Sequence, residues 1–407
     1  MVSAGKKILI SAAMAGKTFL GKRYWGWVYG SFFPRCYRKR QKEPVNPWKV
    51  LFVEQRYQEL SDNFRLLYEA LKKDSRYEIH LHLLQQNDVG RGRFLKNGQK
   101  MLEDMATAGY VFLDDACKVM GRVKKRPETK VVQVWHACGA FKKFGMSTAA
   151  LKFGDNREGI LKYPAYANLD YVTVSSPEVI WAYREAMSLE GKETQIAATG
   201  ISRTDAFFRA ENRDKAFERL YQVMPFARGK KVILYAPTFR GTIGEARTPD
   251  ELELGRMQEA LGDEYVLALK HHPFVKKRPE LSEKVRESFA KDVTAEMSIE
   301  ELLFVADICI SDYSSLIFEY SLFEKPMAFF APDLEDYFDW RGFYYNYEEL
   351  TPGPVFRNQE ELTDYLLHIE ERFDRQRVAD FRERFMSACD GCATERILNL
   401  VFKDTEG

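Results

Sequence analysis

The chain has 407 residues, a formal net charge of +1, 45% apolar residues and 30% charged residues. This composition excludes a disordered or fibrous protein, and the length predicts two globular domains of ordinary size. The charge is unevenly distributed: residues 1–42 hold ten Lys and Arg without Asp or Glu, whereas the other 365 residues hold 51 basic and 60 acidic side chains. We expect no nucleic-acid partner for this acidic body.

Residues 1–46 are predicted to be a basic, amphipathic segment that associates with a membrane. The apolar stretches 8–16 and 24–34 are broken by Lys17, Lys22 and Arg23. A transmembrane helix needs about 20 mostly apolar residues, so we do not expect one here. Aromatic residues interleaved with cations favour the headgroup layer of an anionic membrane. These residues are Tyr24, Trp25, Trp27, Tyr29, Phe32 and Phe33. A signal peptide, with an apolar stretch at residues 8–14, and a disordered basic tail remain alternatives.

The six cysteines have no spacing typical of a disulfide framework, which favours a reducing cytoplasm. Cys389 and Cys392 form a Cys-x-x-Cys motif, but the sequence has no second pair to complete a zinc site. We therefore predict a protein held peripherally on the cytoplasmic face of the membrane.

From residue 47 onwards, short apolar runs alternate with helical patterns. Predicted strands cover 49–53, 77–84, 110–113, 131–134, 171–174, 231–235, 265–270, 308–310 and 327–330. Predicted helices cover 61–71 and 316–320, and a charged helical stretch begins near residue 359. This alternation predicts an α/β protein with parallel, doubly wound sheets. We place two Rossmann-like domains at residues 47–198 and 199–380, facing each other across a cleft, and a C-terminal helix at 381–407.

Candidate site residues follow the ends of several predicted strands, where open α/β sheets bind their ligands. They are His136, Thr238, His272 and the run 312–315. Each alone has a structural alternative, because a histidine after a strand is often structural and serine often simply caps a helix. Together they predict an enzyme that handles a nucleotide-activated phosphate.

The run from Ser311 to Ser315 is the most phosphate-like element. Ser314 or Ser315 is predicted to begin a helix whose free backbone N–H groups favour an anion. Glu319, one turn further, is either a partner for ribose hydroxyls or a solvated helix residue. The sequence shows no Gly-rich phosphate loop and no metal motif, so we predict a site without metal or cofactor.

These motifs resemble the CDP-glycerol glycerophosphotransferase family of teichoic acid synthesis, in the family's order, from about residue 50 to 397. The matching blocks are 133–145, Gly200 to Asp205, Tyr235 to Arg240, Lys270 to Pro273, Ser311 to Ser315, Arg341 to Tyr345 and Pro352 to Val355. Ala137, Ser202 and Lys270 depart from the residues usual in the family.

The resemblance implies a two-domain GT-B fold with an acceptor-side first domain and a second domain that binds a CDP-polyol. It implies transfer of glycerol phosphate or ribitol phosphate from the CDP-polyol to a lipid-linked glycan or polyol-phosphate acceptor, with release of CMP. His136 is then the general base, and His272 acts with it at the phosphates. Implied donor-binding residues are Thr238, Arg240, Lys270, Asp312, Ser314, Ser315, Glu319 and Arg341. Lys142 and Lys143 are expected to meet the acceptor's phosphates.

Two alternatives remain open at this level. A nucleotide-sugar glycosyltransferase of the same fold would release a different nucleotide, such as UDP. A catalytically inactive membrane scaffold would show no turnover.

Overall fold

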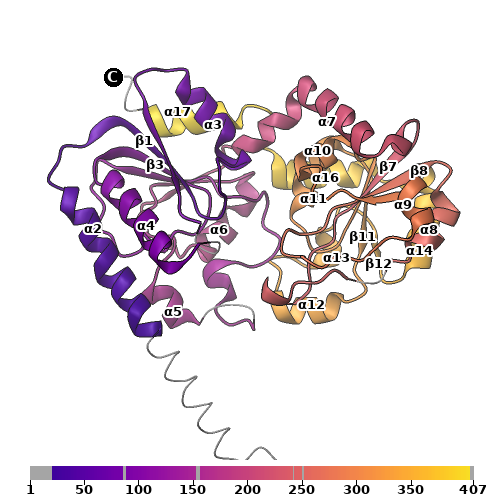
Figure 1. The fold of residues 1–407 in the computed structure, drawn as a ribbon, viewed down its shortest axis with the longest axis horizontal. Coiled ribbons are helices and arrows are strands. Elements are labelled where there is room, and N and C mark those ends of the chain that lie inside the picture. Colours follow the sequence, from indigo (N-terminus) through magenta and orange to yellow (C-terminus); the bar gives the residue numbers. More distant parts are fainter. Residues whose placement is uncertain (1–20, 86–88, 153–155, 242, 250–251, 404–407) are drawn as a thin grey trace, which may run out of the picture.

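The chain folds around two six-stranded sheets in which every strand pair is parallel (Figure 1). The computed structural model describes residues 21–403 except 86–88, 153–155, 242 and 250–251, and it leaves out the side chains of residues 243 and 338–341. Helices cover both faces of each sheet, so the strands are buried and consist of nearly continuous apolar runs. The prediction of an α/β protein with two parallel-sheet domains is confirmed.

The first sheet has the order β2-β1-β3-β4-β5-β6. Its strands are β1 Asn46–Glu54, β2 Glu78–Leu83, β3 Ala108–Leu113, β4 Lys130–Gln133, β5 Tyr171–Thr173 and β6 Gln195–Ala197. Helices α3 Asp62–Lys72, α4 Arg91–Met105, α5 Arg157–Lys162 and α6 Ile180–Ala186 belong to this half. The strand order reverses between β1 and β3, and such a switch point opens a crevice at the carboxyl ends of the strands.

The second sheet has the order β12-β11-β10-β7-β8-β9. Its strands are β7 Lys231–Tyr235, β8 Tyr265–Leu269, β9 Ala290–Asp292, β10 Ile308–Ser311, β11 Met327–Phe330 and β12 Val355–Phe356. Its helices are α7 Ala210–Val223, α8 Leu254–Leu261, α9 Glu283–Ser288, α10 Ile299–Val305, α11 Leu316–Tyr320, α12 Leu334–Arg341, α13 Tyr347–Leu350, α14 Gln359–Leu367 and α15 Ile369–Arg372. The switch point here lies between β7 and β10.

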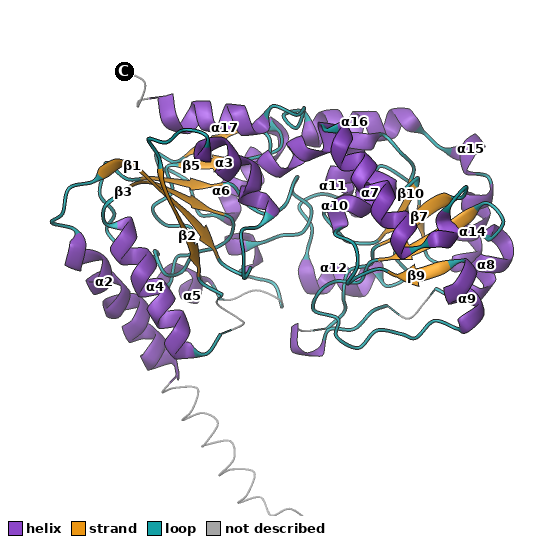
Figure 2. Cartoon of the chain, turned by 45° about the horizontal axis from the view of Figure 1, so that its top comes forward, coloured by secondary structure: helices purple, strands orange, loops and turns teal. Residues whose placement is uncertain are grey.

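The C-terminal part returns to the first domain, which corrects the prediction of a single helix over 381–407. Helix α16 Arg375–Met386 lies against the second domain, and α17 Ala393–Phe402 lies over the first (Figure 2). Phe402 packs on Tyr110 of β3 with ring centroids 4.2 Å apart, and Ile397 is fully buried in the core of the first domain. The C-terminal helices α16 and α17 therefore pack on the second and the first domain, whereas the sequence pattern predicted one helix outside both domains.

The segment before β1 is also part of the fold, which corrects the predicted domain start at residue 47. Residues 21–40 are helical and include a π-helical turn at Val28–Phe32 and helix α2 Phe33–Arg40. Tyr29 and Phe33 are buried rather than free for a headgroup layer, and Phe33 packs on Phe94 of α4. The expectations for residues 1–20, including the signal-peptide alternative, lie outside the described residues.

The opposite side of this helical segment is polar. We call the following exposed residues the basic face: Lys22, Arg23, Trp27, Arg35, Arg38, Lys39 and Lys42. In the part of the chain that the structure describes, no helix combines the length and apolarity needed to cross a bilayer.

The run from Gly200 to Asp205 determines the backbone path of the link between the two domains. Gly200 has a φ of 85°, and a Cβ atom there would lie 2.1 Å from the carbonyl oxygen of Ala388, so only glycine fits. The Asp205 carboxylate accepts hydrogen bonds from the backbone N–H groups of Ala393 and Thr394 and thereby caps α17. This run therefore fixes where the chain returns to the first domain.

Candidate active site

A cleft of about 430 Å³ lies between the two domains and is lined by the segments that follow their strands. Seven residues predicted from the sequence line it: His136, Lys142, Lys143, Thr238, His272, Ser314 and Ser315. The first domain also contributes Arg56, Trp135 and Tyr183, and the second contributes Phe239, Phe274 and Tyr337. The structure therefore brings together side chains as far apart in the sequence as Arg56 and Tyr337.

His136 follows β4 and is held in one tautomer. The preceding residue, Trp135, has a φ of 59°, a left-handed conformation that is uncommon outside glycine and concentrated at functional sites. Nδ1 of His136 lies 3.1 Å from the carbonyl oxygen of Asp114, which can only accept a hydrogen bond. In the neutral ring Nδ1 therefore carries the proton, and Nε2 keeps the lone pair that a general base needs.

The surroundings keep the His136 ring neutral. Burial lowers the pKa of His136 below its ordinary value of 6.5, and the Asp115 carboxylate, 3.8 Å from Nδ1, offsets this only in part. A base must be unprotonated to act, and a lowered pKa means that protonation begins only at more acidic pH.

We expect the pH profile of kcat/KM to reflect this shift. The acid limb should have its midpoint below pH 6.5, because His136 stays neutral until the pH falls through its lowered pKa. The measurement is initial rate against pH from 5 to 9 at low donor concentration, with circular dichroism as the control for folding. An acid limb at or above pH 6.5 would contradict this assignment.

Three carboxyl groups behind His136 were missed by the sequence analysis. Glu54 ends β1, and Asp114 and Asp115 follow β3, on either side of the switch point of the first sheet. Burial raises the pKa of both Glu54 and Asp114, and the nearby Glu54 charge raises that of Asp114 further. The pair therefore holds a proton at a higher pH than isolated carboxyl groups do. Polar residues at the ends of buried strands are the same signal that identified His136.

Arg56 is a second residue that sequence reasoning missed. Its Nε lies 2.5 Å from Oδ2 of Asp115, and its side chain lines the cleft while remaining about half exposed. Asp115 therefore connects two groups at the cleft, since its other oxygen faces His136.

His272 has the opposite tautomer to His136. The backbone N–H of Phe274 donates to Nδ1 of His272 at 3.2 Å, so in the neutral ring the proton must sit on Nε2. The rings of Phe239 and Phe274 flank it, with centroids 4.8 and 4.7 Å away. Burial lowers the pKa of His272 to about 4, helped by the charges of Lys142 and Arg56. His272 therefore presents a neutral N–H donor at neutral pH.

Asp312 and Arg240 support the site rather than line it, which corrects their predicted role as direct donor contacts. The buried Asp312 carboxylate accepts hydrogen bonds from the backbone N–H of Thr238 at 2.8 Å and from its hydroxyl at 3.0 Å. Arg240 donates to Asp312 and to Thr238 and forms a two-pronged pair with Asp333. This network fixes the turn after β7 and so places Thr238 at the cleft.

Ser314 and Ser315 lie between β10 and α11, where the helix begins, and both line the cleft. The Ser315 side chain makes no capping hydrogen bond, and the Ser314 hydroxyl accepts only a long bond, 3.4 Å, from Leu316 N–H. The alternative that the Ser315 side chain simply caps α11 is therefore not supported. Both side chains are half-buried and border the cleft.

Lys142 and Lys143 lie on a loop that the second domain holds in place. The backbone N–H of Lys143 donates to the carbonyl of Gly342 at 3.1 Å, and Tyr344 N–H donates to the carbonyl of Phe141 at 3.0 Å. Both lysines therefore border the cleft as part of a loop bound to both domains. The Arg341 side chain, also predicted at this site, lies outside the described residues.

Two further predicted donor contacts are corrected. The Lys270 ammonium donates to the carbonyl oxygens of Thr294 and Met297, so this side chain is directed into its own domain instead of the cleft. The Glu319 carboxylate is buried and paired with Arg203, which leaves it neither solvated nor open to a ribose.

Arg203 joins three parts of the site. It donates to Glu319 of α11, to Asn63 of α3 at 2.9 Å and to the backbone carbonyl of His136 at 2.8 Å. Burial alone would lower the pKa of Arg203, but the Glu319 carboxylate raises it, so the guanidinium stays charged. The Arg203 side chain, which is only 14% exposed, thus holds the loop that carries His136 against the second domain.

A family model described as CDP-Glycerol:Poly(glycerophosphate) glycerophosphotransferase matches residues 35–403. The chain belongs to this family. It is therefore an enzyme, and the predicted family is confirmed. The inactive-scaffold and glycosyltransferase alternatives lose their support.

Curated relatives span most of the chain. The teichoic acid ribitol-phosphate primase of Bacillus spizizenii is 37% identical over 364 residues, which cover 88% of this chain and 92% of that protein. The teichoic acid glycerol-phosphate primase of Bacillus subtilis is 31% identical over 73% of this chain and 74% of its own length. The chain spans only 60% of the teichoic acid poly(ribitol-phosphate) polymerase of Bacillus spizizenii, which is 33% identical.

Solved structures agree with the fold. The H444N variant of the wall teichoic acid polymerase TagF superposes with a TM-score of 0.76 over 92% of this chain and 93% of that one. At 23% identity this likeness concerns the fold alone.

Proposed function

We propose that this glycerophosphotransferase family member transfers a polyol phosphate from a CDP-polyol to a hydroxyl of a membrane-linked acceptor, with release of CMP. The reaction belongs to the synthesis of teichoic acid or a related cell-surface polymer. The two domains act as a GT-B type pair, with the donor in the second domain and the acceptor in the first. The observation that carries this proposal is the pair of opposite histidine tautomers at one cleft: a proton acceptor on His136 and a proton donor on His272.

The chemical step is a displacement at the phosphorus that bears the polyol. The acceptor oxygen forms a new P–O bond while the bond between that phosphorus and the bridging oxygen of CMP breaks. The hydroxyl proton passes to Nε2 of His136, and the electron pair leaves with CMP. A neutral imidazole suits this transfer because its unprotonated Nε2 can accept the hydroxyl proton at neutral pH.

The second domain supplies hydrogen-bond donors for the phosphates. These donors are Nε2–H of His272 and the hydroxyls of Ser314 and Ser315 on one wall of the cleft. Thr238 borders the same wall, where its own hydroxyl donates to Asp312. Donors fixed by the protein stabilise developing negative charge without reorganising during the reaction. Arg56, Lys142 and Lys143 add positive charge from the first domain, where the acceptor's phosphates are proposed to lie.

Removing one of these donors should weaken use of the CDP-polyol. For His272→Ala, and separately Ser315→Ala, we expect the KM for the donor to rise about 10- to 150-fold, since a hydrogen bond to a charged group is worth about 1.5–3 kcal/mol. Steady-state kinetics with a saturating acceptor measures this, and His368→Ala, at an exposed histidine outside the cleft, is the matched control. Unchanged donor kinetics in both variants would show that the phosphates of the CDP-polyol do not bind at this wall of the cleft.

The donor itself is tested by nucleotide release. CDP-ribitol, CDP-glycerol and UDP-glucose are offered separately with a lipid-linked acceptor, and CMP and UDP are quantified by chromatography. We expect CMP from a CDP-polyol and no UDP. The relatives favour CDP-ribitol as the better donor, because the ribitol-phosphate primase is 37% identical and the glycerol-phosphate primase 31%. Release of UDP without CMP would instead indicate a glycosyltransferase.

The enzyme is proposed to act from the cytoplasmic face of the membrane, attached peripherally by the basic face. One side of the helical segment 21–40 is buried on α4, so lipid can be met only by the opposite, exposed side. Trp27, 48% exposed, is the aromatic residue on that face suited to the headgroup layer.

Neutralising the basic face should reduce binding to anionic vesicles. For the combined change of Lys22, Arg35, Arg38 and Lys42 to Gln, we expect a loss of about 1 kcal/mol per cation, with a smaller difference at high salt. Vesicle co-sedimentation measures this. The matched control changes four other exposed cations, Lys72, Lys73, Arg213 and Lys215, to Gln. Equal binding by both variants would place the membrane contact elsewhere.

A further inference from the structure

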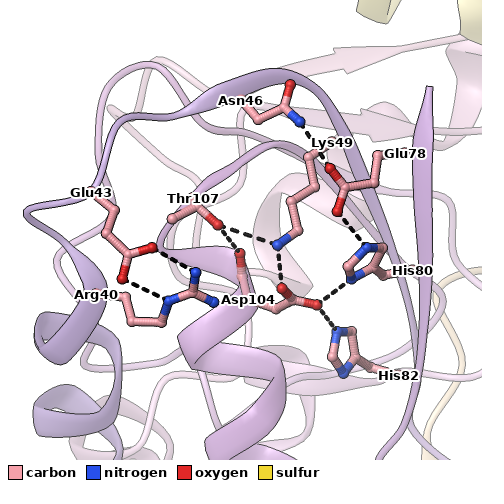
Figure 3. A network of polar contacts seen from close by, with 9 residues as sticks. All are labelled: Arg40, Glu43, Asn46, Lys49, Glu78, His80, His82, Asp104 and Thr107. Atoms are coloured by element: carbon pink, nitrogen blue, oxygen red, sulfur yellow. Dashed lines mark hydrogen bonds and ion pairs between the residues drawn. The ribbon is translucent and has the colours of Figure 1, made fainter. Parts of the chain in front are cut away.

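Three metal-ligating side chains meet at the outer edge of the first sheet, and none of them lines the cleft (Figure 3). His80 and His82 occupy alternate positions on the edge strand β2, and alternate residues of a strand point to the same side. Asp104 lies near the end of α4 and meets both of them. One ligand atom from each residue lies within 4.8 Å of the other two.

The ring of His80 lies between two carboxylates. Nδ1 of His80 lies 2.5 Å from Oδ2 of Asp104, and Nε2 of the same ring lies 2.7 Å from Oε1 of Glu78. A neutral imidazole has only one N–H and cannot donate to both carboxylates. Nε2 of His82 also lies on Oδ2 of Asp104, at 2.9 Å. Two ring nitrogens thus converge on one carboxylate oxygen.

We infer that His80, His82 and Asp104 bind a zinc ion. With the metal on Nδ1 of His80, the remaining Nε2–H donates to Glu78, and the conflict at the ring is removed. Two imidazole nitrogens and one carboxylate oxygen form a donor set that Zn²⁺ accepts, with water in the fourth position. Mg²⁺ and Ca²⁺ prefer sites built from oxygen atoms alone. The inference is independent of the proposed transfer reaction.

The surrounding residues hold these ligands in place. Glu78 accepts a hydrogen bond from the Asn46 amide at 2.9 Å, which orients it toward His80. The second oxygen of Asp104 pairs with the ammonium of Lys49, which also donates to the hydroxyl of Thr107. Outer partners of this kind fix ligand orientation in metal sites. The His80 side chain is 34% exposed, so a metal ion has a path from solvent.

The zinc ion would tie the edge strand to the helix that carries the N-terminal segment. α4 packs against α2 through Phe94 and Phe33, and Lys39 of α2 pairs with Glu103, the neighbour of Asp104, at 3.0 Å. A metal bridge between β2 and α4 would therefore stabilise the platform under the basic face. Its role is structural, because the three ligands do not border the cleft.

The test uses the untagged full-length protein after treatment with a chelator. It is dialysed against ZnCl₂ at micromolar concentration, zinc is counted by elemental mass spectrometry, and thermal unfolding is recorded with and without the metal. We expect one zinc ion per chain, a Tm raised by several degrees in zinc, and neither effect with MgCl₂. Cobalt(II) in place of zinc should give visible absorption bands of a four-coordinate site.

The variants His80→Gln and His82→Gln keep a polar side chain on the strand and remove one ligand each. We expect at least a tenfold loss of zinc affinity and loss of the Tm rise in each, while circular dichroism without metal matches wild type. His368→Gln and Cys392→Ser, at an exposed histidine and an exposed thiol, should bind zinc like wild type. A full-length protein that takes up no zinc would overturn the inference, as would uptake and a Tm rise that both histidine variants retain.

Discussion

Replacing His136 by alanine should lower turnover by about 10²- to 10⁴-fold, the range typical for loss of a general base. Nε2 of His136 is the proton acceptor at the cleft whose tautomer is fixed by a backbone carbonyl, here that of Asp114. The measurement is CMP release per enzyme under saturating donor and acceptor.

The variant His136→Asn distinguishes loss of the basic nitrogen from loss of the hydrogen bond that orients the side chain. Its side-chain amide offers an N–H donor for the Asp114 carbonyl but no basic nitrogen, so we expect a loss of turnover as large as that of the alanine variant. His368→Ala, on the outer surface, is the matched control and should leave turnover unchanged. Turnover within tenfold of wild type in both His136 variants would exclude the general-base role.

Replacing Arg203 by methionine should lower the free energy of unfolding by about 3–5 kcal/mol, because it leaves the buried Glu319 carboxylate without its partner. The change also removes the donors to Asn63 and to the backbone carbonyl of His136, so turnover should fall as well. Urea unfolding followed by circular dichroism measures the stability.

A second substitution distinguishes the lost ion pair from a simple packing defect. In the double variant Arg203→Met, Glu319→Leu the buried charge is gone, and replacing both members of a buried pair by apolar residues is often nearly neutral. We expect the double variant to regain most of the lost stability. A single variant that costs less than about 1 kcal/mol, or a double variant less stable than the single one, would show that the pair does not join the domains as described.

The sequence predicted the strands and much of the cleft because both depend on local patterns. Continuous apolar runs such as 232–235 and 265–269 can only be buried strands or short buried helices, and both proved to be strands. Parallel strands of one sheet share one carboxyl edge, so His272 and Ser315 could be expected near each other. The prediction of two domains that face each other across a cleft places His136 opposite them. The short strands β9 and β12, of three and two residues, carry too little pattern to be predicted.

Interactions between distant side chains could not be predicted in this way. Glu319 pairs with a residue 116 positions earlier, and Lys270 turns toward carbonyl groups of its own domain; neither follows from spacing along the chain. A long side chain after a strand can extend toward a ligand in the cleft or toward its own domain. Only the packing around the side chain determines which of the two directions it takes. Glu54 and Asp114 are different, since they follow buried strands and the rule that identified His136 would have found them.

The N-terminal segment shows a further limit of pattern reasoning. Aromatic residues on one side of a helix indicate an apolar partner but do not say whether that partner is lipid or protein. For Tyr29 and Phe33 the partner is the first domain. Gly98 of α4 leaves room for the Phe33 ring, since a Cβ atom there would lie 2.6 Å from it. That complementarity is visible only once both helices are in place.

The central claim is a division of roles across the cleft: His136 acts on the acceptor's proton, and His272 holds the donor's phosphates. Isothermal titration of CDP-ribitol into wild type, His136→Ala and His272→Ala, without acceptor, tests this most directly. We expect His136→Ala to bind the donor within a few-fold of wild type and His272→Ala to bind it about 10- to 150-fold more weakly. Donor binding that is lost in His136→Ala and unchanged in His272→Ala would contradict it.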